Sequence, residues 1–358
     1  MLKYYTYRLP FKKPFSVFGN EYEYREGIVL VYTEGDIMAF GEVAPLPGFS
    51  EETLSQVEDV LKMNRSTLEL SLQNDTANQM LEVLEKIHGF PSLSFGLDSL
   101  IHDLAAKKAN ITLHEFLFKK KNPSGVSANA TLSFQDEKKA LKNAEVLIKK
   151  GFNTLKVKLG QDFDRELQLL KKLRHQFPHV KIRIDANQAW EVEEAIYHLK
   201  KMDTLKIEYC EQPISKENFE GLRNVKKTTT IPIAADESVR NKTDAFRLSK
   251  AGIVDVLILK PTLLGSFKNI FVTKSMASSH NIKVVFTTGM ESAIARSAIA
   301  VLSSGLGDSD FAQGLATGIF FKHDVGRNSW IDESIVQFPN SPGLGVSVDF
   351  KLLEEIQE

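Results

Sequence analysis

The sequence predicts an α/β protein in which an α+β domain precedes a (β/α)8-type barrel. From about residue 126 the pattern alternates between short apolar strands and amphipathic helices, through seven or eight units. No G-x-G-x-x-G motif opens any of these helices, which disfavours a doubly wound dinucleotide-binding sheet. Three successive strands end in a carboxylate, and the spacings between Asp185, Glu211 and Asp236 are 26 and 25 residues. Each spacing matches about one strand-plus-helix unit.

Composition excludes several classes of function. The 358 residues are 42% hydrophobic and 25% charged, with a formal net charge of −1, which is typical of a soluble globular protein. No basic run is interleaved with aromatic residues, so we expect no nucleic-acid partner. Cys210 is the only cysteine, which excludes an intramolecular disulfide and fits a reducing compartment. No run approaches the ~18 apolar residues of a membrane span, and residues 1–5 lack a signal-peptide pattern, so we expect a cytoplasmic protein.

The first third of the chain is expected to form a hairpin sheet followed by helices. Residues 27–32 and 38–43 are rich in β-forming residues, and the segment 34–36 between them, which contains a glycine, is typical of a hairpin turn. Ser50, followed by two glutamates, is the expected start of a helix. Helical spacing of apolar residues follows at 51–63, 76–88 and 94–109.

The barrel units follow a turn-rich segment at 122–125, which marks the expected domain boundary. Besides the three strands that end in carboxylates, we expect strands at 126–132, 154–159, 254–260, 283–288 and, short, at 310–314, and helices at 135–150 and 162–176. The alternation is lost from about residue 325. The sequence therefore predicts an α+β domain at 1–122, a barrel at 123–324 and a segment at 325–358 that returns to the first domain.

The strand-end carboxylates indicate a metal site. Active sites of barrel enzymes lie at the C-terminal ends of the strands, where Asp185, Glu211 and Asp236 would converge. A lone carboxylate at a strand end is more often a helix cap or a solvated group, but three in a row are far more specific. Three oxygen ligands suit Mg²⁺, or Mn²⁺, better than zinc.

Three lysines lie beside these carboxylates in the predicted barrel. Alternation along the strand points Lys156 and Lys158 to the interior, and Lys260 ends a strand on the opposite side. An amine with its ordinary pKa of ~10.4 is protonated and is no base, but near a metal ion and a second lysine we expect that pKa to fall toward neutrality. The set favours removal of a proton α, or vinylogous, to the carboxylate of a small-molecule substrate.

Neighbouring polar residues have more ordinary expected roles. Arg183 lies two positions before Asp185, so it faces the interior and is expected to be an electrostatic partner of the metal site. Asn187 is a supporting or capping candidate. Alternation places Glu208 and Glu237 on the faces opposite the neighbouring ligands, away from the site.

The chain carries five motifs that resemble those of the enolase superfamily, in its muconate-lactonizing subgroup: K-V-K at 156–158, D-A-N-Q-A-W at 185–190, E-Q-P at 211–213, A-D-E-S at 235–238 and L-K-P at 259–261. The resemblance covers nearly the whole chain. It implies a modified (β/α)7β barrel, of the TIM-barrel type, with an α+β capping domain built from the N-terminal part and the C-terminal tail. It also implies that the three carboxylates bind Mg²⁺ and that Lys158 is the base on one face.

The subgroup holds several activities, among them o-succinylbenzoate synthase, dipeptide epimerase and cycloisomerase. Residues 41–53 and 259–265 look like the capping loop and the sixth strand of the synthase, which acts in menaquinone biosynthesis. Dipeptide epimerases carry a D-x-D at the end of the eighth strand, where this chain reads G-L-A-T-G at 314–318. The D-x-D at 308–310 falls before that strand. The resemblance therefore favours the synthase.

For a synthase, the resemblance implies that Lys158 removes the ring proton and then assists departure of hydroxide from the same face. Lys260 would stabilise the intermediate by charge and cation–π contact. We expect contacts to the substrate from free N–H groups at the start of the seventh barrel helix and from two capping loops, through Gly289, Met290, Glu291, Phe18 and Phe49.

Two alternatives stay open. A dipeptide epimerase or N-acylamino-acid racemase would use Lys158 and Lys260 to exchange protons on opposite faces of the substrate. A non-catalytic barrel would use the carboxylates only to hold a structural cation. The sequence leaves the oligomeric state open.

Overall fold

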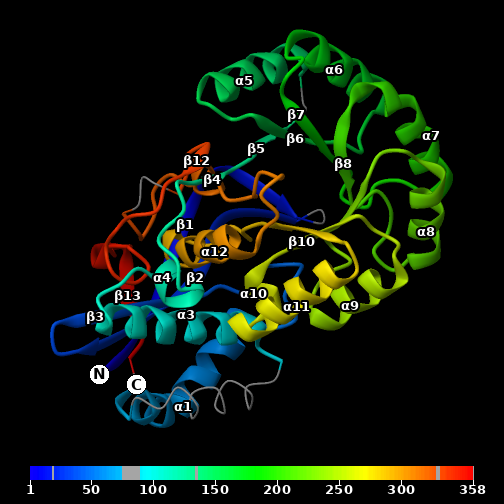
Figure 1. Cartoon of the computed structure of the whole chain (residues 1–358). Helices are drawn as coiled ribbons and strands as arrows, with labels where there is room; N and C mark the ends of the chain where they lie inside the picture. The colour runs from blue at the N-terminus through cyan, green and yellow to red at the C-terminus, as the bar shows by residue number, and fades with distance from the viewer. Residues whose placement is uncertain (18–19, 75–88, 134–135, 328–330, 358) are drawn as a thin grey trace.

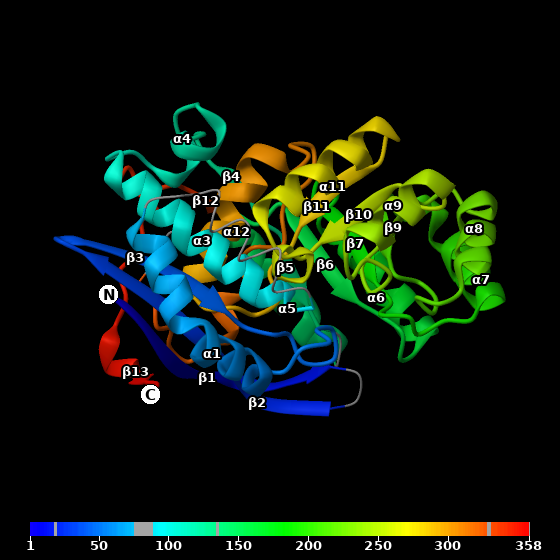
Figure 2. The same cartoon turned by 90° about the horizontal axis from the view of Figure 1, so that it is seen from below.

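Two sheets organise the computed structural model, which describes residues 1–17, 20–74, 89–133, 136–327 and 331–357 (Figure 1). One sheet is antiparallel, with strand order β13-β1-β2-β3, and the other is parallel, with order β11-β10-β9-β8-β7-β6-β5. Figures 1 and 2 show the antiparallel sheet and its helices against one side of the curled parallel sheet. The predicted fold class, a modified barrel with an α+β capping domain, is confirmed.

The antiparallel sheet is built from β1 (Leu2–Val17), β2 (Asn20–Glu34) and β3 (Ile37–Val43). The predicted hairpin is present, and Gly35 closes it with a φ of +56°, a conformation that glycine adopts at little cost. β13 (Leu353–Glu355) pairs antiparallel with β1, so the far end of the chain joins this sheet.

Three helices accompany this sheet in the described part of the chain: α1 (Leu54–Gln73), α3 (Pro91–Lys108) and α4 (Leu113–Phe118). The expected helix start at Ser50 is wrong. Thr53 is the N-cap of α1, and its side chain and that of Gln56 form a capping box. The Ser50 hydroxyl instead accepts a hydrogen bond from the Leu46 amide at 2.9 Å and so shapes the loop before the helix. The helix expected at 76–88 lies outside the described residues.

α3 lies unusually close to β3, and two glycines allow the approach. A Cβ on Gly41 would stand 2.0 Å from the carbonyl oxygen of Gly96, and a Cβ on Gly96 would stand 2.6 Å from that of Glu42. Neither position therefore has room for a side chain. The apolar cluster between the sheet, α1 and α3 is anchored by Ile28, Leu30, Val57, Leu61, Leu93, Leu97 and Leu100, all fully buried.

The parallel sheet follows the predicted order. Its strands are β5 (Ala130–Leu132), β6 (Thr154–Lys158), β7 (Lys181–Asp185), β8 (Ile207–Glu211), β9 (Ile233–Ala235), β10 (Val256–Leu259) and β11 (Lys283–Phe286). The helices between and after them are α5 (Glu137–Lys149), α6 (Phe163–Gln176), α7 (Val192–Met202), α8 (Phe219–Thr228), α9 (Lys242–Ala251), α10 (Pro261–Leu264), α11 (Phe267–Ser279) and α12 (Ala293–Leu306). Along the described part of the chain, every helix is too short or too polar to cross a lipid bilayer.

The first predicted barrel strand, 126–132, is divided in the structure. β4 (Val126–Ser127) pairs antiparallel with β12 (Ile335–Val336), and only β5 joins the parallel sheet. The division arises because β12, near the end of the chain, returns to this region and pairs with residues 126–127. Part of the C-terminal segment thus lies beside β4, just before β5, and part lies in the antiparallel sheet.

The predicted eighth strand at 310–314 is reduced to two bridging residues. Gln313 forms a parallel bridge with Ala128, and Gly314 forms one with Thr287. The first contact lies beside β5 and the second beside β11, which are the two edges of the parallel sheet. This short segment therefore closes the barrel without forming a regular strand.

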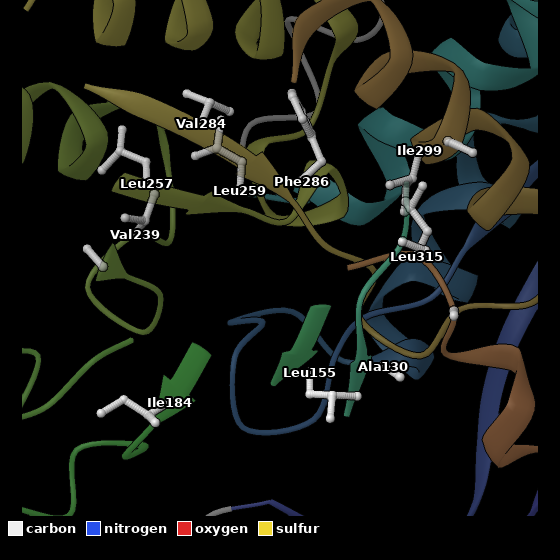
Figure 3. Close-up of a cluster of buried hydrophobic side chains, with 14 of the residues drawn as sticks. Ala130, Leu155, Ile184, Val239, Leu257, Leu259, Val284, Phe286, Ile299 and Leu315 are labelled. Carbon is white, nitrogen blue, oxygen red and sulfur yellow. The ribbon is translucent and has the colours of Figure 1, made fainter. Parts of the chain in front are cut away.

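Alternation along the strands sorts their side chains into two layers. Leu155, Ile184, Leu257 and Val284 belong to the large apolar cluster shared with the surrounding helices, part of which Figure 3 shows. The inward-facing cluster is small and consists of Tyr209, Ala234, Val256, Ile258 and Val285. Above it, toward the C-terminal strand ends, the interior becomes charged.

Glu42 joins the capping domain to the barrel. Its fully buried carboxylate accepts hydrogen bonds from the Tyr7 hydroxyl at 2.5 Å, from the amides of Ser292 and Ala295 at 2.8 Å each, and from the Ser292 hydroxyl. Burial raises the pKa of Glu42 although these hydrogen bonds oppose the rise. Because the two amides lie at the N-terminus of α12, the carboxylate satisfies donors that the helix leaves unpaired.

Candidate active site

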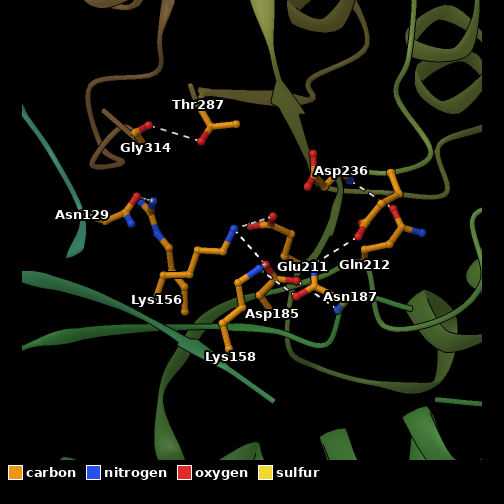
Figure 4. Close-up of polar contacts among 12 residues, drawn as sticks. Asn129, Lys156, Lys158, Asp185, Asn187, Glu211, Gln212, Asp236, Thr287 and Gly314 are labelled. Atoms are coloured by element: carbon orange, nitrogen blue, oxygen red, sulfur yellow. Dashed lines mark hydrogen bonds and ion pairs between the residues drawn. The ribbon is translucent and has the colours of Figure 1, made fainter. Parts of the chain in front are cut away.

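The three predicted ligands lie together at the C-terminal ends of β7, β8 and β9 (Figure 4). Asp185 and Glu211 are direct neighbours across the parallel pairing of β7 and β8. Asp236 follows the last residue of β9. All three are almost fully buried. Inward alternation therefore delivers these side chains to one place, as the sequence predicts.

Lysines contact each of the three carboxylates, and Figure 4 shows the contacts of Lys156 and Lys158. The Lys156 ammonium bridges two of them, at 2.9 Å from Asp185 and 2.6 Å from Glu211. Lys158 Nζ lies 2.6 Å from Asp185. From the other side of the barrel, the ammonium of Lys260 is paired with Asp236. The strand β6 and the residue that follows β10 thus bring amines to opposite sides of one group of carboxylates.

The charge state of Lys156 is set by the carboxylates around it. Burial by itself would lower the pKa of Lys156, but Asp185, Glu211 and Asp236 together raise that pKa well above its usual value. The lowered pKa expected for the base beside a metal ion and Lys156 stays a prediction, because Lys156 itself is governed here by the neighbouring carboxylates. The protonated form of Lys156 is therefore favoured at the base of the site.

The carboxylates respond to one another as well. Burial would raise the pKa of Asp185, but Lys156 and Lys158 hold it below its usual range. Burial and the charge of Asp185 raise the pKa of Glu211 to about 8. Like-charge repulsion thus persists although three lysines contact the group. A further positive charge near Asp185 and Glu211 would reduce this repulsion.

Glu237 belongs to the site, which sequence reasoning missed. It is 1% exposed, and its Oε1 accepts a hydrogen bond from the Asn187 side chain at 3.1 Å. Burial and the charge of Asp236 raise its pKa to about 7. The expectation that it faces away is wrong because β9 ends at Ala235, so strand alternation does not reach residue 237.

Asn187 lies where the sequence places a supporting residue. Its Oδ1 accepts a hydrogen bond from Lys158 Nζ at 2.7 Å, and its backbone amide donates to Asp185 at 3.0 Å. Its φ of +45° lies in the left-handed region, as do those of Gln188 and Gln212 at +66° and +38°. Non-glycine residues in this region cluster at functional sites, and all three directly follow strands that carry a predicted ligand.

Arg183 has a role different from the one expected. In the described part of the chain its hydrogen bonds go to Glu208 at 2.5 Å, to Asn129 and to the Ala312 carbonyl, and not to the three predicted ligands. Its guanidinium lies over the Tyr209 ring, 4.8 Å from the centroid. Arg183 therefore fills the barrel beneath the site and is not a direct partner of the carboxylates.

The placement of Glu208 explains this difference. The pairing of β7 and β8 shifts register between residues 182 and 184, which marks an irregularity in the ladder. The shift turns Glu208 toward Arg183 and Lys181 rather than toward the helices or solvent. The expectation from simple alternation is therefore wrong at this residue.

The capping loop reaches the site through Phe49. The Lys260 ammonium lies over the Phe49 ring, 4.6 Å from its centroid. Buried Arg25 of β2 holds the start of this loop by donating to the carbonyl oxygens of Ala44 at 2.6 Å and Pro45 at 2.7 Å. Phe18, on the second predicted capping loop, lies outside the described residues.

Residues 289–291 differ from the expected anion site. Both oxygens of buried Glu291 are engaged, by the Thr262 hydroxyl at 2.9 Å and the Gly289 amide at 2.6 Å. At the start of α12, the amides of Ser292 and Ala295 are held by Glu42 and that of Ala293 by Asp324. The expectation of free N–H groups on this helix is wrong at these three amides.

Met290 occupies a different position from Glu291. It lines a 640 Å³ cavity between the β1–β2 hairpin and the capping loop, together with Phe15, Tyr22, Arg25 and Leu46. A cavity of this volume holds a small organic ligand. Contacts of Met290 and Gly289 with a substrate remain predictions.

A divalent cation fits the chemistry of this site. The donors are hard carboxylate oxygens, and Glu237 Oε2 is buried with no hydrogen-bond partner among the described residues. In the described ranges, no three acidic, histidine or cysteine side chains stand close enough to coordinate one ion as they are placed. Lys156, which bridges two of the carboxylates, occupies the space between them.

Two family models match the chain. The model described as enolase C-terminal domain-like matches residues 139–352, and the model described as MenC, N-terminal domain, matches residues 1–104. Among curated relatives, a hydrophobic dipeptide epimerase of Enterococcus faecalis is 27% identical, covering 89% of this chain and 91% of the relative. An o-succinylbenzoate synthase of Bacillus subtilis is 26% identical, covering 98% of this chain and 94% of the relative.

Solved structures share the fold. A muconate lactonizing enzyme from Pseudomonas fluorescens, complexed with muconolactone, superposes with a TM-score of 0.88 at 22% identity, over 98% of this chain and 97% of the other. A dipeptide epimerase from Enterococcus faecalis, complexed with Mg and the dipeptide L-Leu-L-Tyr, gives a TM-score of 0.86 at 23% identity, over 97% and 98%. Both likenesses extend over the capping domain and the barrel.

Proposed function

We propose that this chain, which belongs to the enolase C-terminal domain-like family, is a Mg²⁺-dependent o-succinylbenzoate synthase. Its substrate would be a succinyl-cyclohexadiene carboxylate that carries a hydroxyl group, and the reaction would remove water from the ring. The observation that carries the proposal is the placement of Lys158 and Lys260, which approach one buried group of carboxylates from opposite sides. A structural cation site would need neither amine.

The carboxylates would hold the cation. Asp185, Glu211 and Asp236 would supply the oxygen ligands. Burial and the charge of Asp185 raise the pKa of Glu211 although Lys156 lies 2.6 Å from it, so an added cation would favour its ionised form. A cation bound there would stabilise the negative charge that develops on the substrate carboxylate when the neighbouring proton leaves. That a solved dipeptide epimerase of the same fold is complexed with Mg supports this choice of ion, and Mn²⁺ has similar ligand preferences.

Lys158 would move the proton. The C–H proton α to the carboxylate passes to the Lys158 amine, and the resulting ammonium then gives the proton to the departing hydroxyl group, which leaves as water. Proton removal and hydroxide departure would thus take place on one face. Asn187, which contacts Lys158 Nζ at 2.7 Å, would hold the amine in place between the two transfers.

Lys260 would act through charge. It is 8% exposed and lies between Asp236 and the Phe49 ring, so its ammonium is held on both sides. From there it would stabilise the anionic intermediate on the face opposite Lys158 without transferring a proton. The Phe49 loop would at the same time exclude water from that side.

The match of residues 1–104 to the MenC N-terminal domain supports the synthase over other reactions of this fold. That part of the chain contains the capping loop with Phe49. The positions 314–318, expected to carry a D-x-D in an epimerase, contain no acidic residue. Asp308 of the nearby D-x-D pairs with Lys274 and with Lys283, the first residue of β11, so it lies at the end of the barrel away from the site.

Dipeptide epimerase is the second candidate, because similar curated relatives include a hydrophobic dipeptide epimerase of Enterococcus faecalis and an L-Ala-D/L-Glu epimerase of Francisella tularensis. In that reaction Lys158 and Lys260 would exchange protons on opposite faces of the α-carbon. The geometry of the two amines is compatible with both reactions, so substrate recognition separates them. A cytoplasmic location remains a prediction.

One experiment separates the candidates. We would follow loss of the cyclohexadiene absorbance of the synthase substrate with Mg²⁺ present, with EDTA and Lys158→Ala as controls. Rapid metal-dependent loss that disappears in the variant supports the synthase. No loss, together with uptake of deuterium from D2O at the α-carbon of a dipeptide or N-acylamino acid, would overturn it in favour of the epimerase or racemase. Stabilisation by Mg²⁺ with neither activity would indicate a structural cation site.

A further inference from the structure

We infer that Glu237 is a positioning residue that orients the side-chain amide of Asn187 and, through it, the amine of Lys158. The inference rests on the proposed function in one respect, namely that Lys158 is the group that moves the proton. Glu237 is a buried carboxylate in addition to the three expected cation ligands, and the inference gives it a role.

The contacts form one directed chain. Lys158 Nζ donates to Asn187 Oδ1 at 2.7 Å, and Asn187 Nδ2 donates to Glu237 Oε1 at 3.1 Å. While Lys158 is protonated it only donates, and an ionised Glu237 only accepts, so a single orientation of the amide satisfies both neighbours. Turning the amide by half a rotation would point its NH2 group at the lysine and its oxygen at the carboxylate. Glu237 thereby selects the orientation that holds the amine.

Lys158 needs this support more than its neighbours do. Its side chain is 40% exposed, whereas those of Lys156 and Lys260 are 15% and 9% exposed. Two groups hold its nitrogen, the Asp185 carboxylate at 2.6 Å and the Asn187 carbonyl. Because a cation on Asp185 would compete for that carboxylate, Asn187 would be the remaining anchor in the loaded enzyme.

The backbone brings Asn187 close but leaves its amide free to turn. The left-handed φ of +45° and the hydrogen bond from its backbone N–H to Asp185 at 3.0 Å fix the Cα position. Neither contact constrains the final torsion of the side chain, which is soft in asparagine. Glu237 is the group that acts on this torsion.

Stability alone is a poor explanation for Glu237. The residue is 1% exposed, and its Oε2 has no hydrogen-bond partner among the described residues. A buried carboxylate that is only half satisfied destabilises a fold relative to a well-packed apolar residue. A role at the site accounts for its presence, and positioning Asn187 is the role for which the structure shows a contact.

The test compares Glu237→Gln with Glu237→Leu. Glutamine keeps an oxygen that accepts from Asn187 Nδ2, whereas leucine removes the acceptor and has a similar volume. We expect kcat to fall about fivefold to tenfold in Glu237→Leu, the effect of one lost positioning hydrogen bond, with little change in KM. In Glu237→Gln we expect kcat within about threefold of the parent. Equal loss in both variants would overturn the inference, because it would show that the charge matters and not the acceptor.

A double-mutant cycle tests whether the effect passes through Asn187. In an Asn187→Leu background, Glu237→Leu should have no further effect on kcat, because the intermediate link is already absent. Full additivity would overturn the inference. Mg²⁺ affinity, measured by calorimetry, should change by less than about twofold in Glu237→Gln, and a larger loss would indicate that Glu237 is instead a cation ligand.

A substrate-free measurement separates this inference from the proposed function. Competitive labelling of lysine amines with acetic anhydride, read by mass spectrometry on the whole chain without Mg²⁺, reports how firmly each amine is held. Lys158 should be labelled about fivefold faster in Glu237→Leu and in Asn187→Leu, with Lys260 unchanged as the internal reference. This pattern would stand even if the synthase substrate were not turned over. Unchanged labelling of Lys158 in both folded variants would overturn the inference whatever the reaction is.

Discussion

The aromatic ring of Phe49 lies over the ammonium group of Lys260, with Nζ 4.6 Å from the ring centroid. The two residues come from the capping loop and from the segment after β10, so this contact joins the two parts of the molecule at the site. The partner of the ammonium on its other side is Asp236. A cation held between a ring and a carboxylate keeps its position while the loop is closed.

We expect loss of the Phe49 ring to weaken catalysis without unfolding the protein. A desolvated cation–π contact contributes ~2 kcal/mol, so Phe49→Ala should lower kcat/KM by about thirtyfold. Phe49→Tyr keeps a ring and should stay within about threefold. Steady-state kinetics on both variants, with the free energy of unfolding measured in parallel, checks the prediction. Equal activity in Phe49→Ala and the parent would show that the contact has no catalytic role.

Substitution of Lys260 distinguishes a charged group from a proton donor. If Lys260 acts by charge alone, Lys260→Arg should retain about a tenth or more of the synthase activity, whereas Lys260→Met should lose about a thousandfold. Arginine stays protonated and cannot exchange protons. Incorporation of solvent deuterium from the Lys260 face by the parent, and its loss in Lys260→Arg, would contradict the charge-only role and favour two-face chemistry.

Local rules of strand geometry predict the site well where the strands are regular. Lys156, Lys158, Asp185 and Glu211 all alternate along β6, β7 and β8, and their inward direction follows from sequence alone. Asp236 follows the same rule one residue beyond β9. The order of the barrel units could be predicted for the same reason, because each unit repeats one hydrophobic pattern.

The rules fail where the regular geometry ends. Glu208 turns inward because the β7–β8 ladder shifts register, and a single sequence carries no signal for that shift. Glu237 reaches the site because it lies past the end of β9, whose length the sequence does not determine. The raised pKa of Lys156 arises because three carboxylates lie close to it and outweigh the effect of burial, and this proximity is a property of the tertiary structure. Thr53 and not Ser50 caps helix α1, and the Ser50 hydroxyl instead accepts a hydrogen bond from the preceding loop.

Binding of Mg²⁺ should release protons. Burial and the charge of Asp185 raise the pKa of Glu211 to about 8 in the cation-free protein, so this carboxyl holds a proton more tightly than an exposed glutamate does. Coordination requires the ionised form, and we therefore expect the apparent affinity for Mg²⁺ to rise by up to about tenfold per pH unit below pH 8. Calorimetric titrations in buffers of different ionisation enthalpy measure the protons released. Heats that do not depend on the buffer would contradict the raised pKa.

The raised pKa of Glu211 should also make the stability of the cation-free protein depend on pH. An acid whose pKa is raised in the folded state binds more protons folded than unfolded between the two pKa values, so the free energy of unfolding falls as pH rises. The contribution of Glu211 is complete below its unfolded pKa of about 4.5 and is lost by about pH 8. Denaturant unfolding with EDTA at a series of pH values should show this decline, and Glu211→Gln should flatten it. A parent profile as flat as that of the variant would contradict the assignment.

Glu42 should contribute strongly to stability, because it satisfies donors from both parts of the molecule. Its carboxylate accepts from the Tyr7 hydroxyl and from the Ser292 and Ala295 amides at the N-terminus of α12. Glu42→Leu would leave these donors unpaired and buried, and we expect the free energy of unfolding to fall by ~3–5 kcal/mol. Glu42→Gln keeps an acceptor but loses the interaction of the charge with the helix, so a fall of ~1–2 kcal/mol is expected.

Tyr7→Phe is the matched control for Glu42, since it removes one donor and leaves the carboxylate in place. Tyr7→Phe should lower the free energy of unfolding by about 1 kcal/mol. This is less than the loss expected for Glu42→Gln, which removes the charge, or for Glu42→Leu, which removes the acceptor. Equilibrium unfolding in urea gives the three values under one set of conditions. We expect the largest loss of stability in Glu42→Leu, a smaller loss in Glu42→Gln and the smallest in Tyr7→Phe. This order follows from the number and kind of contacts that each substitution removes. A Glu42→Gln variant more stable than Tyr7→Phe would show that the helix N-terminus contributes nothing, and that the carboxylate serves the capping domain alone.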